Sequence, residues 1–427
     1  MLLLIMFIVF VTMLILGFPI YLSLIASSII YILLSPELNI LMAVQRIVVA
    51  PDSFTLLAVP FFILAGQIMN SGGVTKRIFA FAKDLVGHFR GGLGYVNILA
   101  SIIFAGMSGS ALADAGGLGL VEIKAMRDEG YDDKFSIGVT ASSSTIGPII
   151  PPSIPFVIYG AMANVSVGGL FVGGIIPGLI MGAALAVMVY IMARKQGYPR
   201  AERSSLKKIL LSFYEAFLAL LMPLIIIGGI WIGFFTPTES AFVSILYAII
   251  VTGFVYRELS LKSLLSLMIE TIKMVAPAIM IVAGASLFGW ILNYEKVDKY
   301  LMSLILSITT NKWVILFIIN IILLFLGMFL EVIAVIMLML PILQPITQIV
   351  GIHPIHLGVV MVLNLMIGLL TPPVGFVLYI LSSTTKRPFN YVIKAVAPWI
   401  LPLLLALVFI TYIPELVLFL PKVFGFI

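Results

Sequence analysis

Four consecutive hydroxyl side chains stand inside an apolar stretch of the sequence, at Ser142, Ser143, Ser144 and Thr145. Glycine and four prolines follow at once in the run GPIIPPSIP, which occupies residues 147–155. Each proline removes a backbone donor and clashes with the carbonyl one turn earlier, so a continuous helix here is disfavoured. Within a bilayer, backbone groups freed in this way are tolerated only where protein or a water-filled cavity covers them. The segment therefore predicts a broken helix whose oxygens and amides are available to a ligand.

A second copy of this pattern lies in the other half of the chain. The motif I-G-x-x-x-P-P begins at Ile146 and again at Ile367, 221 positions later, and F-V-[IL]-Y follows in both copies. Two broken helices at matching places in two halves point to the binding site of a secondary transporter. We therefore predict broken helices over residues 134–163 and 356–385.

The composition is that of a polytopic membrane protein, since 62% of the 427 residues are hydrophobic and only 10% are charged. The absence of cysteine excludes disulfides and thiolate metal sites. No Gly-Lys-Ser/Thr sequence is present for an ATP phosphate loop, and GMSGS lacks the spacing of a serine hydrolase motif. We therefore expect a protein that is not an enzyme. The net charge of +6 indicates basic cytoplasmic loops, and no nucleic-acid partner is expected.

A re-entrant hairpin is predicted directly before each broken helix. Residues 93–126 begin apolar, become small and polar through GMSGSALADAGGLG, and end in charged residues, which would make a poor single helix. The tip of this first hairpin is expected near Ser108–Ser110. The sequence F-x-G-M occurs in both halves at the same offset of 221, so a second hairpin is predicted over residues 313–349 with its tip near Gly327–Glu331.

The remaining helices are expected from apolar runs. Gly17-Phe18-Pro19 divides residues 1–34 into two short helices. Basic and aromatic residues alternate over residues 72–90, which predicts an interfacial amphipathic arm with residues 296–310 as its counterpart. Single helices are predicted at about residues 53–70, 168–193, 212–234, 238–256, 270–293 and 391–413.

The order of these elements predicts two inverted repeats, over residues 1–205 and 206–427. A further match supports the duplication, since G-x-I-[ML]-N occurs at Gly66–Asn70 and at Gly289–Asn293. Each repeat has five spanning helices, one of them broken, plus the hairpin, and an odd number of spans inverts the second repeat. Placing both termini in the periplasm puts most of the 24 Lys and Arg in cytoplasmic segments, as the positive-inside rule requires. The two hairpins then open to opposite sides, and their tips can meet at mid-bilayer.

The segments GMSGSALADAGGLG, IGPIIPPSIPFVIYG and TPPVGFVLY resemble those of the large membrane subunit of a TRAP transporter (tripartite ATP-independent periplasmic transporter), and the resemblance covers essentially the whole chain. It implies a Na⁺-driven importer of organic anions, such as sialic acid or C4-dicarboxylates, in the bacterial inner membrane. It also implies two partners, a small four-helix membrane subunit and a periplasmic substrate-binding protein. By the same resemblance, residues 93–165 and 313–385 form a transport domain that moves like an elevator against a scaffold made by the remainder.

Two or more Na⁺ ions and no organic cofactor are expected, because unwound carbonyls and hydroxyls supply the oxygens that a small hard cation requires. The first is expected between the first hairpin tip and the first break, at Gly106, Ser108, Ser143, Ser144 and Gly147. The second follows from the repeat, at Gly327, Met328, Asn364, Gly368 and Thr371. The alternative is that these hydroxyls only bond back to carbonyls of their own helices.

The N-termini of half-helices offer free N–H groups to a substrate carboxylate. The candidates for contact with the substrate are Ser110, Pro151, Pro152, Ser153, Thr371, Pro372 and Pro373. Asp114 and Glu331 join them as the two carboxylates deepest in apolar sequence, where an ionised acid is costly unless it faces a cavity or a partner. Each of the two acids has a structural alternative, which is to cap the N-terminus of a hairpin helix or to pair with a lysine of the scaffold.

Two other classes of transport protein remain as alternatives. A stand-alone Na⁺/dicarboxylate symporter of related architecture would transport without a small subunit or a binding protein. An anion channel would show flux that does not depend on Na⁺.

Overall fold

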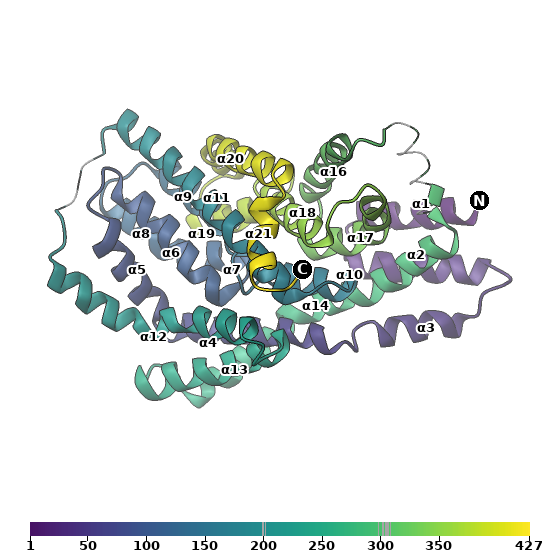
Figure 1. Cartoon of the computed structure of the whole chain (residues 1–427), viewed down its shortest axis with the longest axis horizontal. Coiled ribbons are helices and arrows are strands. Elements are labelled where there is room, and N and C mark those ends of the chain that lie inside the picture. The colour runs from purple at the N-terminus through teal and green to yellow at the C-terminus, as the bar shows by residue number, and fades with distance from the viewer. Residues whose placement is uncertain (199, 201, 298, 301–302, 304–306, 308) are drawn as a thin grey trace.

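Glycine and proline determine where the first helices end. The computed structural model describes residues 1–427 except 199, 201, 298, 301–302, 304–306 and 308. Helix α1 (Leu2–Ile15) stops before the Gly17-Phe18-Pro19 turn, and α2 (Ile20–Leu34) begins directly after it. The prediction of two short helices in this region is therefore confirmed, and Figure 1 shows them side by side near the N-terminus.

The described residues form helices, and no strand occurs among them. In the first half, the helices after α2 are α3 (Ile40–Val49), the 3₁₀ turn η1 (Phe54–Leu57), α4 (Ala58–Ser71), α5 (Val74–Val86), α6 (Gly92–Ser108), α7 (Ala111–Gly116), α8 (Leu118–Asp128), α9 (Asp133–Ser144), α10 (Ile154–Ala163) and α11 (Val167–Gln196). In the second half they are α12 (Leu206–Trp231), α13 (Pro237–Ile249), the π-helical turn η2 (Ile250–Val255), α14 (Leu261–Tyr294), α16 (Lys312–Gly327), α17 (Val332–Ile349), α18 (Pro354–Gly368), α19 (Phe376–Thr385), α20 (Phe389–Tyr412) and α21 (Glu415–Val423). Among the described residues, seven helices are long and apolar enough to cross a membrane.

Four features differ from the sequence expectations. The helix expected from residue 212 begins earlier, at Leu206, because Ser205 caps it. The short helix α3 was not predicted, and it begins where the Asn39 side chain accepts a hydrogen bond from the backbone of Leu41. The helix expected from residue 270 begins earlier, at Leu261, because Ser260 caps it. The short helix α21 after α20 was also missed. Seven of the fifteen residues of the predicted arm over 296–310 lie outside the described residues.

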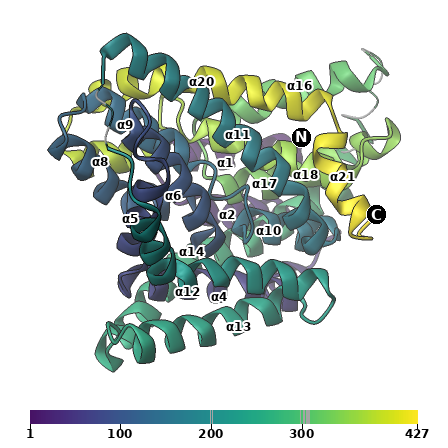
Figure 2. The same ribbon diagram turned by 60° about the vertical axis from the view of Figure 1, so that its left-hand side comes forward.

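The long helix α14 joins several parts of the molecule. It packs against α2, α3 and α4, and also against α17 of the second hairpin. Helix α13 packs along α4, and Figure 2 shows α13 at one edge of the molecule with α20 and α16 at the opposite edge. The helices predicted as scaffold and those predicted as transport elements therefore meet along α14.

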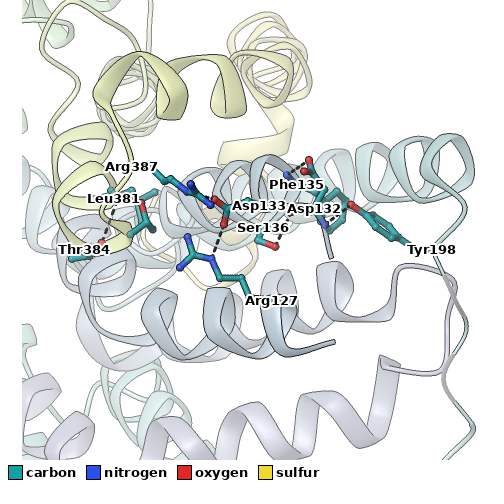
Figure 3. Close-up of polar contacts among 10 residues, drawn as sticks. Arg127, Asp132, Asp133, Phe135, Ser136, Tyr198, Leu381, Thr384 and Arg387 are labelled. Atoms are coloured by element: carbon teal, nitrogen blue, oxygen red, sulfur yellow. Dashed lines mark hydrogen bonds and ion pairs between the residues drawn. The ribbon is translucent and has the colours of Figure 1, made fainter. Parts of the chain in front are cut away.

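Asp133 ties together three segments from both halves of the chain (Figure 3). Its carboxylate accepts from the Nε of Arg127, at the end of α8, and from the Nε of Arg387, between α19 and α20, each at 2.6 Å. Asp132 next to it caps α9 and donates its backbone N–H to the Tyr198 hydroxyl at 3.1 Å. Bonds of this kind hold the ends of the first hairpin, the first broken helix and the second broken helix in one arrangement.

Candidate functional site

Both predicted helix breaks are present. The first lies between α9 and α10, where helix stops at Ser144 and resumes at Ile154. Ser153 caps the new helix by accepting from the backbone N–H of Phe156 at 3.2 Å, and its hydroxyl donates to the Pro148 carbonyl. The second break lies between α18 and α19, at residues 369–375. Proline is responsible for both, because it cannot continue the hydrogen-bond ladder of the preceding helix.

The tip of the first hairpin lies against the first break. Gly109 ends α6 with a φ of +57°, and a Cβ at this position would lie 2.5 Å from the Pro152 carbonyl oxygen. A Cβ on Gly147 would lie 3.8 Å from the carbonyl oxygen of Ser110. At position 109, only glycine combines a positive φ with so close an approach to a backbone oxygen. The predicted neighbours from hairpin and broken helix are thus in contact here.

The tip of the second hairpin lies against the second break in the same way. A Cβ on Gly368 would lie 2.7 Å from the Cα of Gly327. The carbonyl of Met328 accepts from the backbone N–H groups of Val374 at 3.2 Å and Gly375 at 3.4 Å. The lone pairs of the Met328 carbonyl, which we predicted as a cation ligand, are therefore used by these amides in this conformation.

Two of the predicted cation ligands at the breaks, Ser144 and Thr371, bond back to their own helices, as the structural alternative expected. Ser144 Oγ donates to the Ala141 carbonyl at 2.8 Å, and Thr371 Oγ1 donates to the Ile367 carbonyl at 2.9 Å. Each bond uses the hydroxyl proton and leaves oxygen lone pairs free. Back-bonding and cation binding are thus compatible at these positions.

Sequence reasoning missed two buried asparagines that join each hairpin to the broken helix of its own half. Asn97 of α6 accepts from Ser143 Oγ at 2.6 Å and donates to Thr140 Oγ1 and Glu122 Oε2 at 2.7 Å each. Ser143 thus contacts the middle of α6 and not the hairpin tip. The polar signal was there, since each asparagine is a lone amide in an apolar run, as in VNILA and IINII.

The second missed asparagine, Asn320, makes the equivalent connection in the other half. Asn364 of α18 donates to the side-chain oxygen of Asn320, in α16, at 2.7 Å.

Several buried polar oxygens near the breaks find no hydrogen-bond partner among the described residues. They are Ser108 Oγ, Asp114 Oδ2, Glu122 Oε1, Ser142 Oγ and Asn364 Oδ1. Buried oxygens without partners are uncommon in native proteins, and a cation or water is one explanation for them.

A cavity of about 150 Å³, which we call the central cavity, lies where the hairpins and broken helices meet. It is lined from the four elements by residues that include Gly109, Ser110, Pro148, Ile154, Glu331, Met366 and Leu369. Ile63 of α4 and Met274 of α14 close it from the other side. Helices predicted for the transport domain and helices predicted for the scaffold thus line the same cavity.

Two of the predicted substrate residues line the central cavity, Ser110 and Glu331. Both cap a helix, since Ser110 Oγ accepts from the Ala113 N–H at 3.4 Å and Glu331 Oε2 accepts from the Ile333 N–H at 2.9 Å. The other predicted substrate residues are not among those that line it. They are Asp114, Pro151, Pro152, Ser153, Thr371, Pro372 and Pro373.

Pro151 and Asp114 lie outside the lining of the central cavity for different reasons. Pro151 lines a separate apolar cavity against α12. Asp114 is 1% exposed and buried within the hairpin. Sequence position within a break therefore does not decide which side of the break a side chain faces.

A second cavity adjoins the central one, and we call it the Glu270 cavity. It has a volume of about 350 Å³ and includes Gln67, Asn70, Ser110, Glu270 and Met274 in its lining. Ser110 and Met274 line both cavities, together with Ile63 and Ile154. The central cavity is therefore approached from the end of the molecule where Glu270 lies.

The sequence matches the family model of the DctM component of tripartite ATP-independent periplasmic transporters over residues 7–416. It is 48% identical over 408 residues to the sialic acid TRAP transporter large permease protein SiaM of Vibrio cholerae, covering 96% of each chain. It is 45% identical to the sialic acid TRAP transporter permease protein SiaT of Haemophilus influenzae, over 95% of this chain and 66% of that protein. It is 41% identical to the C4-dicarboxylate TRAP transporter large permease protein DctM of Pseudomonas aeruginosa, over 88% of each.

Among solved structures, the chain is similar to the YdaH transporter of Alcanivorax borkumensis, with a TM-score of 0.65 and 13% identity over 87% of this chain and 86% of that one. At that identity the similarity concerns the fold alone. It agrees with an all-helical, polytopic membrane protein.

Proposed function

Because the chain belongs to the DctM component family of TRAP transporters, we propose that it is the large permease of a Na⁺-coupled importer for a sialic acid. The two relatives of 48% and 45% identity, both named for sialic acid, support this cargo over a C4-dicarboxylate. The observation that supports a transport site most directly is the central cavity, where both hairpin tips and both broken helices converge. This convergence is the arrangement expected of a midplane binding site built from discontinuous helices.

Na⁺ is proposed as the coupling ion because the surroundings of the breaks are rich in neutral oxygens. Ser108, Ser142 and Asn364 each have a buried oxygen without a partner among the described residues. Among those residues, no cluster of three His, Cys, Asp or Glu side chains exists to hold a transition metal. Hydroxyl, amide and carbonyl oxygens are ligands for a hard cation.

We expect Ser144→Ala and Thr371→Val each to raise the Na⁺ concentration for half-maximal uptake by about tenfold. Each substitution removes one proposed ligand, and a hydrogen-bond-strength contact to a charged group is worth ~1.5–3 kcal/mol. The measurement is uptake of labelled sialic acid into proteoliposomes across a Na⁺ series. Ser28→Ala is a control, since Ser28 also bonds back within its own helix but lies in α2, away from the breaks. Unchanged Na⁺ dependence in both site variants would reject the site assignment.

Two partners belong to the proposal, a small membrane subunit and a periplasmic binding protein, since the family is tripartite by description. In the proposed elevator mechanism, residues 93–165 and 313–385 move as the transport domain past α14 and the other scaffold helices. Omitting each partner from reconstituted vesicles tests this arrangement. Uptake by the permease alone would favour a stand-alone Na⁺/dicarboxylate symporter, and flux without Na⁺ would favour an anion channel.

The proposed location is the bacterial inner membrane, with both termini in the periplasm. Under this topology a cysteine introduced at Arg200 is expected to react only with reagents that reach the cytoplasmic side, because the adjacent basic loop is assigned there. The chain has no native cysteine, so the label reports on one position. Labelling of intact cells and of inverted vesicles with an impermeant thiol reagent makes the comparison. A signal from intact cells would reverse the proposed orientation.

A further inference from the structure

A third cavity lies apart from the central cavity, and we call it the Arg46 cavity. It has a volume of about 410 Å³ and is lined by Arg46 of α3, by one face of α14 and by the second half of α17. It shares no lining residue with the central cavity among the described residues. Under the proposed topology it opens toward the periplasm, whereas the Glu270 cavity opens toward the cytoplasm.

The Arg46 cavity and the Glu270 cavity are related by the sequence repeat. The G-x-I-[ML]-N motif contributes Gly66 and Asn70 to the Glu270 cavity, and its second copy contributes Gly289 and Asn293 to the Arg46 cavity. Their charges are opposite, however. Arg46 is the one charged residue among the described residues that line its cavity, and Glu270 is the one charged residue among those that line the other. The repeat thus builds one basic and one acidic vestibule.

The helix α14 connects all three cavities. Its residues Glu270 and Met274 line the Glu270 cavity, and Met274 and Ala278 line the central cavity. The Arg46 cavity is lined by five further residues of this helix, Ala285, Ser286, Gly289, Trp290 and Asn293. At 1.5 Å per residue, Glu270 and Asn293 are separated by ~35 Å along the helix. A mobile central site that moves along α14 would therefore face an acidic vestibule at one end and a basic one at the other.

The side chains of the Arg46 cavity suit a particular ligand chemistry. The Arg46 guanidinium lies 5.7 Å from the centroid of the Trp290 ring, and it forms no ion pair with any described residue. A guanidinium held over an aromatic ring is well suited to a bidentate bond with a carboxylate. Asn293, Gln344 and Gln348 place amides beside it, and amides bond to hydroxyls as donors or acceptors.

From this juxtaposition we propose that the Arg46 cavity is a reception site, separate from the central cavity, for an anion that has one carboxylate and several hydroxyl groups. Arg46 binds the carboxylate, and the three amides bind hydroxyls before the central site becomes accessible. Glu270 repels the same anion at the other end and favours its release. This inference rests on the proposed function for its direction of transport, although binding at the cavity can be measured without transport.

We expect Arg46→Gln to raise the sialic acid concentration for half-maximal uptake about tenfold, while the maximal rate changes less than twofold, because only the reception step loses a charged bond. Lys312→Gln is the matched control. The Lys312 ammonium also lies over a tryptophan ring, 4.6 Å from the centroid of Trp313, and it does not line the Arg46 cavity. Equal half-saturation in Arg46→Gln and wild type would overturn the proposal, whereas the absence of Na⁺-dependent uptake in wild type would overturn the proposed function instead.

A binding measurement separates the two claims. Ser286→Cys introduces the chain's single thiol into the Arg46 cavity without removing any of the proposed binding groups, and its rate of modification by an impermeant thiol reagent is followed in Na⁺-free buffer with sialic acid or with succinate. We expect sialic acid to slow the modification at least threefold, succinate to slow it less, and Arg46→Gln to abolish the protection. Equal rates with and without sialic acid would refute the reception site, even if wild-type uptake is normal.

Discussion

Gly368→Val is expected to reduce Na⁺-dependent uptake to below about a tenth of the wild-type rate while the protein still inserts in the membrane. The tip of the second hairpin touches the second break here, and a Cβ on Gly368 would lie 2.7 Å from the Cα and carbonyl carbon of Gly327. Both atoms belong to the backbone, so no side chain can turn aside to relieve the contact. Overpacking a tight contact costs ~1–3 kcal/mol, which corresponds to about a 5- to 150-fold change in the population of the native arrangement.

The matched substitutions test whether the effect is local. Gly327→Ala should be milder, because its Cβ would meet the Cα of Gly368 at 3.3 Å, a distance that small shifts can relieve. Gly228→Val in α12 should behave as wild type, since no other group lies within 4 Å of a Cβ there. Uptake in proteoliposomes and thermal unfolding of the purified proteins are measured together. Wild-type uptake by Gly368→Val would show that the hairpin tip need not contact the break.

Local signals made the helix breaks and hairpin tips predictable from sequence. Proline and glycine act through their own backbone, so the ends of helix at Ser144, Gly327 and Gly368 follow from nearby residues alone. The short helices α3 and α21 were missed because each spans only 9 or 10 residues, too short for a clear membrane-spanning signal.

The lining of the central cavity was predictable only in part, because it depends on tertiary contacts. Ser110 and Glu331 were identified from their place at hairpin tips, and both line the cavity. Pro151 was selected by the same reasoning but faces α12, since the turn of the break orients it away. Asn97 and Asn320 were missed because a lone amide in an apolar run does not indicate which residue of another helix it will contact.

Glu331 combines a structural role with a place in the central cavity, and the two can be separated. Its carboxylate caps α17 by accepting from the N–H groups of Ile333 and Ala334 at 2.9 and 3.4 Å. Glutamine retains a carbonyl oxygen of the same reach, so Glu331→Gln should keep most of the cap and lose only the charge. A cap contributes ~1 kcal/mol, and the loss of stability in this variant should be smaller than that.

We expect Glu331→Gln to lower uptake at least tenfold although the fold persists. A carboxylate in a cavity accepts hydrogen bonds from cargo hydroxyls or attracts the coupling cation, and such charged bonds are worth ~1.5–3 kcal/mol. Kinetics distinguish the two roles. If Glu331 binds cargo, the half-saturating sialic acid concentration rises and the Na⁺ dependence is unchanged, whereas cation attraction gives the reverse.

Glu239 supplies the control for this experiment, because it also accepts from backbone at a helix N-terminus. Its carboxylate bonds to the backbone N–H of Thr236 at 2.7 Å and forms a capping box at the start of α13, but it is not part of the central cavity. Glu239→Gln should therefore change stability about as much as Glu331→Gln and leave the uptake rate near wild type. Equal uptake in wild type and Glu331→Gln would show that the Glu331 carboxylate only caps α17 and has no role in transport. A helix cap needs an acceptor oxygen, which glutamine keeps, and does not need the charge.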